Sequence, residues 1–81
     1  MNSALSSIKT GQRVSVVSIK DSSLKPKLME MGFVKGKQLT ILFRAPFGDP
    51  IAVDMNGYVL SLRLDEAALI DVHETVAEQR F

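Results

Sequence analysis

The clearest helical pattern in the chain runs from Leu24 to Met31. Leu24, Leu28 and Met31 are spaced at i, i+4 and i+7, which is one stripe of a 3.6-residue period. A serine at position 22 or 23 can cap the start. Pro26 falls in the first turn, where its missing amide proton costs little. The pattern therefore predicts one short amphipathic helix.

Gly32 is predicted to end this helix, because glycine readily takes up the left-handed conformation that often follows a last helical turn. Phe33 can then fold back on Leu28, and Gly36 provides a second turn before a strand. Alternation in that strand leaves Leu42 on the outer face and predicts an inner apolar set of Leu39, Ile41 and Phe43.

Residues 13–19 form another strand candidate, in which the apolar phase changes partway along. Val14 and Val16 share one face, whereas Val17 and Ile19 share the other. Such a change predicts a β-bulge or a strongly bent strand, which a small closed barrel requires.

The strongest local signal is Asn56-Gly57, the preferred pair for a two-residue hairpin turn, between residues 51–55 and 58–62. The turn sets a register that places six apolar side chains on one face: Met55 opposite Tyr58, Val53 opposite Leu60, and Ile51 opposite Leu62. Turn chemistry and apolar pattern agree, so a β-hairpin is predicted here.

Shorter signals lie towards the two ends of the chain. Leu5 and Ile8 are spaced for one helical turn or a strand edge. Asp65 can cap one helical turn, and Ile70 and Val72 then predict a last short strand. The elements together predict a mainly β fold, with about five short antiparallel strands in a small barrel, one inserted helix and a helical turn before the last strand. An open sheet with the helix on one face is the alternative.

The 81 residues are expected to form one domain, with a core over about 5–73 and a flexible tail over 74–81. The absence of cysteine excludes disulfides, thiolate metal sites and cysteine catalysis. The start of the chain is unlike a secretory signal, and no run approaches the roughly 18 apolar residues of a membrane span. We therefore expect a soluble intracellular protein without direct membrane insertion.

The net charge of +1 conceals an asymmetry between the two halves of the chain. Residues 1–44 carry eight basic and two acidic residues, a net +6, whereas residues 45–81 carry two basic and seven acidic residues, a net −5. Such a division is compatible with nucleic-acid or acidic-lipid binding, or with two halves that neutralise each other on folding. The second interpretation is favoured, because no basic cluster contains an aromatic residue on which a base could stack.

Three groups of residues, in order and at compatible spacing over about Leu5 to Val72, resemble the FeoA family of bacterial ferrous iron transport proteins. They are Leu28…Met31-Gly32-Phe33…Gly36, then Ala45-Pro46-Phe47-Gly48-Asp49-Pro50, and then Leu62-Arg63…Glu66-Ala67…Ile70-Asp71-Val72. The resemblance implies an SH3-like barrel and a role as a cytoplasmic accessory to the ferrous iron permease FeoB, with a family-level link to transition metals. A related domain lies at the C-terminus of some metal-dependent transcriptional repressors. A metal-responsive regulator and a nucleic-acid-binding barrel therefore remain as alternatives.

Catalytic and metal chemistry have little support in the sequence. There is one histidine, and no glycine-rich loop followed by the residues that hold a phosphate. His73 with Asp71 and Glu74 is short of the converging ligands of a firm metal site, so we predict neither an enzyme nor a resident metal or cofactor. Asp49 is expected to be a turn residue that bonds its own backbone.

The segment from Ala45 to Pro50 is better suited to docking on a protein, since a loop held by two prolines loses little entropy on binding. Phe47 is either an anchor for a partner or a plug over the end of the barrel. Arg63 is expected to brace this loop through Asp49 or a carbonyl. The candidate partner-binding residues are Met29, Leu42, Arg44, Pro46, Phe47, Gly48 and Asp49, and the expected partner is the permease.

Overall fold

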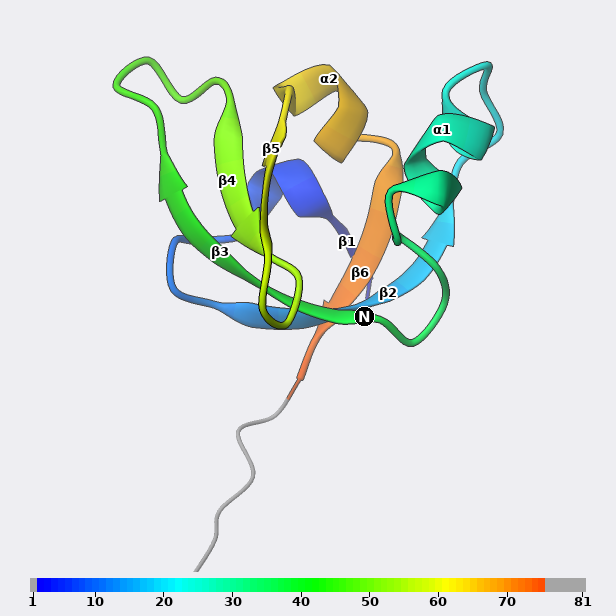
Figure 1. Ribbon diagram of the computed structural model, residues 1–81, viewed down its shortest axis with the longest axis horizontal. Helices are drawn as coiled ribbons and strands as arrows, with labels where there is room; N and C mark the ends of the chain where they lie inside the picture. The colour runs from blue at the N-terminus through cyan, green and yellow to red at the C-terminus, as the bar shows by residue number, and fades with distance from the viewer. Residues whose placement is uncertain (1, 76–81) are drawn as a thin grey trace, which may run out of the picture.

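The computed structural model describes residues 2–75, which form a six-stranded sheet and three short helices. In chain order the elements are β1 (Ser3–Ala4), the 3₁₀ helix η1 (Leu5–Ser7), β2 (Arg13–Ile19), α1 (Lys25–Glu30), β3 (Gln38–Arg44), β4 (Ile51–Asp54), β5 (Val59–Leu62), α2 (Leu64–Ala67) and β6 (Ile70–Glu74). Figure 1 shows the sheet curving around the interior, with α1 and α2 along the upper rim. No helix in this part of the chain is long and apolar enough to cross a membrane.

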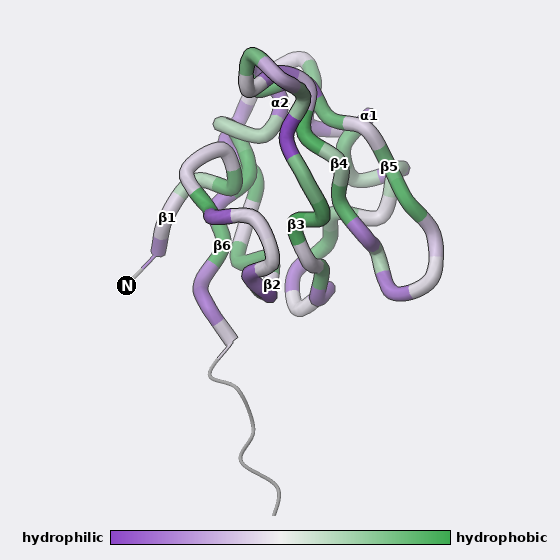
Figure 2. The backbone as a smooth tube through the Cα atoms, turned by 90° about the vertical axis from the view of Figure 1, so that its left-hand side faces the viewer, coloured by the Kyte–Doolittle hydropathy of each residue, from purple (hydrophilic) through white to green (hydrophobic). Residues whose placement is uncertain are grey.

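The sheet has the order β1-β6-β2-β3-β4-β5, and all neighbours are antiparallel. The predicted mainly β barrel with an inserted helix is confirmed. The two-residue strand β1 was not predicted, because it is too short to show an alternating pattern. Two side-chain hydrogen bonds hold the turn between β4 and β5: Arg13 of β2 donates to the Asn56 amide oxygen at 3.1 Å, and the Tyr58 hydroxyl donates to the carbonyl of Met31, at the end of α1, at 3.4 Å. Figure 2 shows hydrophobic stretches along β3, β4 and β5.

The predicted bulge in β2 is present. The register between β2 and β6 shifts between Val16 and Ser18, so Val17 is the residue that is skipped. Because a bulge reverses the side-chain alternation, Val14 and Val16 before it and Ile19 after it are all buried.

Helix α1 ends as the sequence predicted. Gly32 has a φ of +110°, and the Phe33 amide donates a hydrogen bond to the Leu28 carbonyl at 3.1 Å. Phe33 and Leu28 are both fully buried in the core. At the start, the Leu24 amide donates to the Ser22 hydroxyl at 3.0 Å, just before the first helical residue.

The β4–β5 hairpin has the predicted register, with Ile51 opposite Leu62 and Val53 opposite Leu60. Asn56 and Gly57 both have positive φ, of 61° and 122°, as the preferred turn requires. The turn chemistry therefore does specify the pairing of these strands.

Two predictions about the strands and helices were wrong. Phe43 does not face the core, because the β3–β4 register shifts between Ile41 and Phe43 and leaves the Phe43 ring 59% exposed. Asp65 does not cap α2, which begins at Leu64; Asp65 is exposed.

Strand β6 extends through Glu74, and the Thr75 amide donates to the Arg13 carbonyl at 3.2 Å. The rest of the expected tail, residues 76–81, lies outside the described residues.

Candidate docking surface

The loop between β3 and β4, here called the tip loop (Arg44–Pro50), is held in shape by its own backbone. The Gly48 amide donates to the Ala45 carbonyl at 2.7 Å, and the Ala45 amide donates to the Pro50 carbonyl at 2.9 Å. The first bond closes a four-residue turn with Pro46 at its second position and glycine at its fourth, both favoured in β-turns. The loop therefore presents a defined shape before any partner binds.

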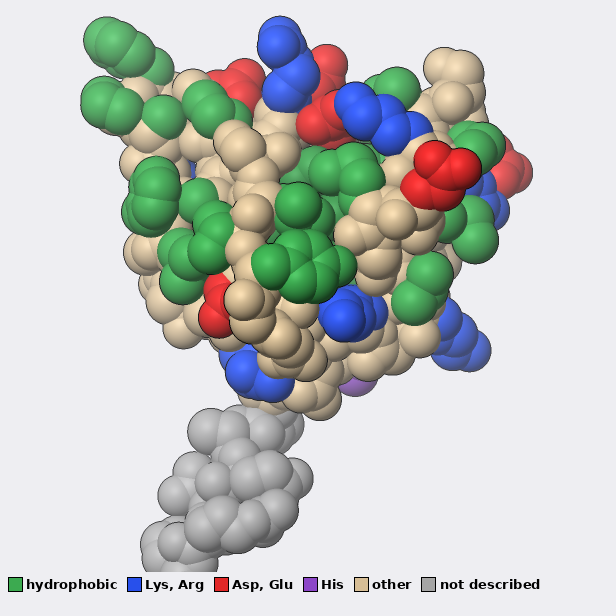
Figure 3. Space-filling model, in the orientation of Figure 1, with side chains coloured by type: hydrophobic (Ala, Val, Ile, Leu, Met, Phe, Trp, Pro, Cys, Tyr) green, Lys and Arg blue, Asp and Glu red, His purple; other side chains and the backbone are tan. Residues whose placement is uncertain are grey.

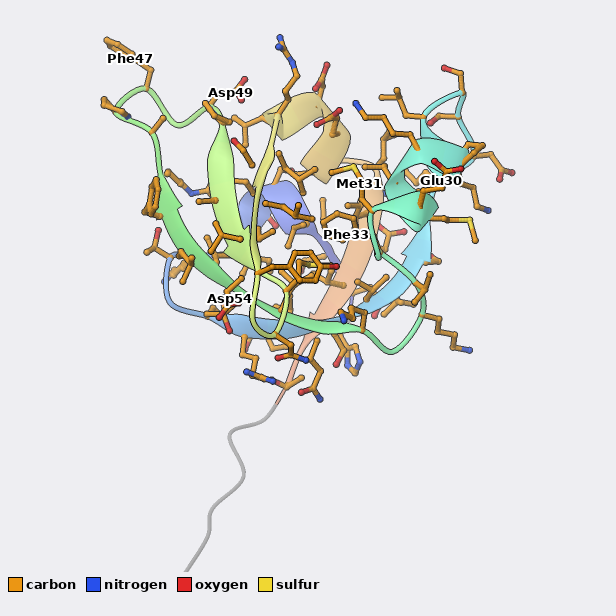
Figure 4. The ribbon with its side chains drawn as sticks, in the orientation of Figure 1. Glu30, Met31, Phe33, Phe47, Asp49 and Asp54 are labelled. Atoms are coloured by element: carbon orange, nitrogen blue, oxygen red, sulfur yellow. The ribbon has the colours of Figure 1, made fainter. Side chains whose placement is uncertain are left out.

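Phe47 occupies the end of this loop and points away from the barrel (Figure 4). Its side chain is 98% exposed, so the alternative that it plugs the barrel is wrong. The space-filling view shows hydrophobic side chains gathered at this corner of the molecule (Figure 3). The other alternative, that Phe47 anchors a partner, stays a prediction.

The base of the tip loop is tied to the start of the chain by Arg44. Its guanidinium donates to the Ser6 carbonyl at 3.0 Å and also to the Ile8 carbonyl. Both acceptors belong to the segment around η1, so Arg44 fixes the loop relative to the barrel. Its part in binding a partner stays a prediction.

The other side of the loop is fixed by Asp49. The sequence predicted that this carboxylate would bond the backbone of its own turn, and that prediction was wrong. Its Oδ1 accepts a hydrogen bond from the Leu64 amide at 3.1 Å. This amide lies at the start of α2, where backbone donors have no helical partner. Arg63, the expected brace, instead lies 3.9 Å from the Asp65 carboxylate, in an exposed and weak ion pair.

Two apolar residues on β3 precede the loop and extend its hydrophobic surface. Leu42 is 38% exposed, and Phe43 is more exposed still because of the bulge. Sequence reasoning missed Phe43. The sequence did contain a signal, because Leu42 is an apolar residue on the face opposite to Leu39 and Ile41. In β2, apolar residues on both faces had likewise indicated a bulge.

Met29 does not join this surface. It lies on α1, on the opposite side of the molecule from the tip loop (Figure 1). There it lines a solvent-open groove of about 230 Å³, here called the α1 groove, formed by Val17, Ser18, Ile19, Lys25, Met29, Phe33, Val34 and Lys35. The structure thus divides the predicted partner-binding residues between two separate places.

The two oppositely charged halves of the chain meet in ion pairs. Lys20 lies 2.7 Å from Asp71, and Lys27 lies 3.0 Å from Glu66. Glu66 is buried, and its carboxylate also accepts a bond from the Arg63 amide at 3.0 Å. This backbone bond and the Lys27 ammonium lower the pKa of Glu66 below its ordinary value. The contacts agree with the interpretation that the halves neutralise each other.

The described residues contain no cluster of three or more side chains able to hold a metal ion. His73 is exposed on β6. Its neighbour Asp71 is engaged by Lys20.

Residues 4–74 match the model of the FeoA domain family, which is most of the chain. The chain belongs to the FeoA family. It is also 36% identical, over 69 residues, to an Fe(2+) transport protein A/Fe(2+) transporter FeoB fusion protein of Porphyromonas gingivalis. That match covers 84% of this chain and 8% of the relative, so it concerns one small part of a much larger protein.

Solved structures of the FeoA family have the same fold. A FeoA-like protein from Clostridium acetobutylicum is 36% identical, with a TM-score of 0.87 over 99% of this chain and 94% of that one. The zinc complex of FeoA from Stenotrophomonas maltophilia, described as a prokaryotic SH3-domain protein, is 28% identical, with a TM-score of 0.76 over 90% and 89% of the two chains. The SH3-like fold implied by the sequence is therefore confirmed.

The same fold occurs in a manganese-dependent transcriptional repressor, which is 22% identical and has a TM-score of 0.84. The match covers 91% of this chain but 37% of the repressor. At this identity the likeness concerns the fold alone.

Proposed function

We propose that this chain is a cytoplasmic accessory of bacterial ferrous iron uptake, which acts by binding a FeoB-type iron permease and not by catalysis. The support comes from the relative in which a FeoA part and a FeoB part share one polypeptide. A covalent tether keeps two parts at millimolar effective concentration. An accessory that acts on the permease through direct contact needs a docking surface, whether or not it is tethered.

The tip loop is the surface that best meets this need, and the observation that carries the proposal is the exposure of Phe47. A ring that is 98% exposed contributes little to the stability of the barrel. The hydrogen bonds around it fix the loop, which lowers the entropy lost on binding. Leu42 and Phe43 supply further apolar area next to it. The proposed partner surface is therefore an apolar pocket on the cytoplasmic part of the permease.

The alternatives have less support. Likeness to a repressor in fold alone does not make this chain a metal-responsive regulator. Nucleic-acid binding needs a basic surface, whereas Lys20 and Lys27 are paired with acidic residues of the other half.

The test is direct binding of the fluorescently labelled chain to the purified FeoB-type permease of the same cell, reconstituted in lipid nanodiscs. The expected result is saturable binding to the permease and none to empty nanodiscs of the same lipids. A second titration with the isolated GTPase domain locates the contact on the cytoplasmic side. Absence of saturable binding to the full-length permease would contradict the proposal.

A further inference from the structure

The α1 groove is a second apolar surface, and the docking of the tip loop on a permease does not use it. Met29 and Val34 on its walls are 47% and 46% exposed, whereas Ile19 and Phe33 are buried beneath. Its volume of about 230 Å³ is larger than the cavity of about 150 Å³ that takes up a benzene molecule in an apolar protein interior. The groove can therefore accept one aromatic ring from outside.

The chain itself carries a ring of this kind on its surface. Phe47 projects from the tip loop with almost none of its surface covered. The loop and the groove lie on opposite sides of the molecule (Figure 1), so Phe47 cannot reach the groove of its own chain. A second copy can present it.

The charges beside the two surfaces are also complementary. Lys25 and Lys35 line the groove, and Lys35 makes no ion pair with any other residue in the described part of the chain. Lys25 lies 3.3 Å from the exposed carboxylate of Asp21. Within the segment 45–50 the only charged residue is Asp49, two positions after Phe47. The Oδ1 atom of Asp49 accepts a hydrogen bond from the Leu64 amide, but the residue is exposed, so its carboxylate can still pair with Lys35 on the groove rim when the ring enters.

We infer that copies of this chain associate head to tail, with Phe47 of one copy seated in the α1 groove of the next. The contact joins two different surfaces, so each copy keeps one free groove and one free loop. Such heterologous contacts give rings or open chains and do not stop at a symmetric dimer. The small contact area predicts a weak and concentration-dependent association.

This inference goes beyond the proposed function and needs no permease. If both hold, a copy whose Phe47 is seated in another copy cannot use the same ring on the permease. Self-association and docking then compete for one side chain.

The experiment is sedimentation velocity on the purified full chain, from about 10 μM to about 1 mM. The wild-type chain is expected to form species larger than a dimer as its concentration rises. Phe47→Ala removes the ring, and Val34→Asp places a carboxylate in the groove. Each variant alone is expected to associate at least about thirtyfold more weakly.

The decisive sample is an equimolar mixture of the two variants. Phe47→Ala keeps a working groove and Val34→Asp keeps a working ring, so together they form one contact. The mixture is expected to give a one-to-one heterodimer and nothing larger. Thermal unfolding checks that each variant is folded, and Met29→Glu replaces Val34→Asp as the groove variant if the latter is not.

Three results would overturn the inference. One is a wild-type chain that stays monomeric up to about 1 mM. Another is either single variant associating as strongly as the wild type. The third is an associating wild type together with a monomeric mixture, which would place the contact elsewhere. None of these samples contains the permease, so their outcome does not decide whether the proposed function is right.

Discussion

The Asp49 carboxylate accepts a hydrogen bond from the Leu64 amide at 3.1 Å, and this bond ties the tip loop to the first turn of α2. The two residues are 15 positions apart in the chain. One side chain thus satisfies an amide that a short helix leaves unpaired, and it also holds the loop that presents Phe47.

Asp49→Ala is expected to lower the free energy of unfolding by about 1 kcal/mol, the usual cost of losing a side chain that caps a helix. For a domain of this size the midpoint of thermal unfolding falls by about 4–8 °C. Asp49→Asn keeps an acceptor oxygen and is expected to stay close to the wild type. Equal losses in both variants would show that the charge matters more than the hydrogen bond.

The sequence predicted that Asp65 would cap this helical turn, and the reason for the error is instructive. Local patterns show which side chains can reach the next few amides, and Asp65 fits that pattern. Instead, the Arg63 amide donates to the Glu66 carboxylate, which follows the helix start, and the Leu64 amide donates to the Asp49 carboxylate, which precedes it by 15 positions. A cap supplied by a distant loop depends on tertiary structure, which no local pattern contains.

Gly32→Val is expected to destabilise the protein strongly. Positive φ disfavours a β-branched residue by about 1–2 kcal/mol, and a Cβ at Gly32 would lie 3.0 Å from the Tyr58 hydroxyl. Gly36→Val is the matched control, because Gly36 also has positive φ but a Cβ added there would meet no atom within 4 Å. Chemical denaturation is expected to give a loss at Gly32 larger by about 1 kcal/mol or more. An unchanged midpoint for Gly32→Val would contradict the observed end of α1.

Much of the fold, but less of the candidate surface, could be predicted from the sequence. The Asn56-Gly57 turn and the Gly32 helix end have strong local signals, and both are present. The bulge at Val17 was predicted because the apolar phase visibly changes there. The same signal at Leu42 was not interpreted as a bulge, so Phe43 was assigned to the core. Exposure of Phe47 could not be decided, because a ring at a loop tip suits either a plug or an anchor.

Because of Glu66, the stability of the folded protein is expected to depend on pH in the acidic range. Its pKa in the folded protein is lowered from 4.5, chiefly by the Arg63 amide and then by Lys27. A lowered folded pKa means that the ionised carboxylate stabilises the folded state fully above about pH 4.5. This stability is lost as the pH falls below that value, through the folded pKa.

Glu66→Gln is therefore expected to be less stable than the wild type at neutral pH and to approach it as the solution becomes acidic. The measurement is urea denaturation of both proteins across this pH range. Asp65→Asn removes the neighbouring exposed carboxylate and serves as the control, with little change in the pH dependence expected. A constant difference between wild type and Glu66→Gln at every pH would rule out the ionised carboxylate as the cause.

Binding of Phe47→Ala to the FeoB-type permease is the most direct test of the central claim, that the tip loop is the docking surface. Because Phe47 is 98% exposed, its truncation is expected to leave the thermal midpoint unchanged. The dissociation constant is expected to rise at least about thirtyfold, as for the loss of a true anchor. Val59→Ala, which trims another exposed apolar residue away from the loop, is expected to bind like the wild type. A folded Phe47→Ala chain that binds the permease as tightly as the wild type would contradict the claim and direct attention to the helix face around Lys25 and Lys27.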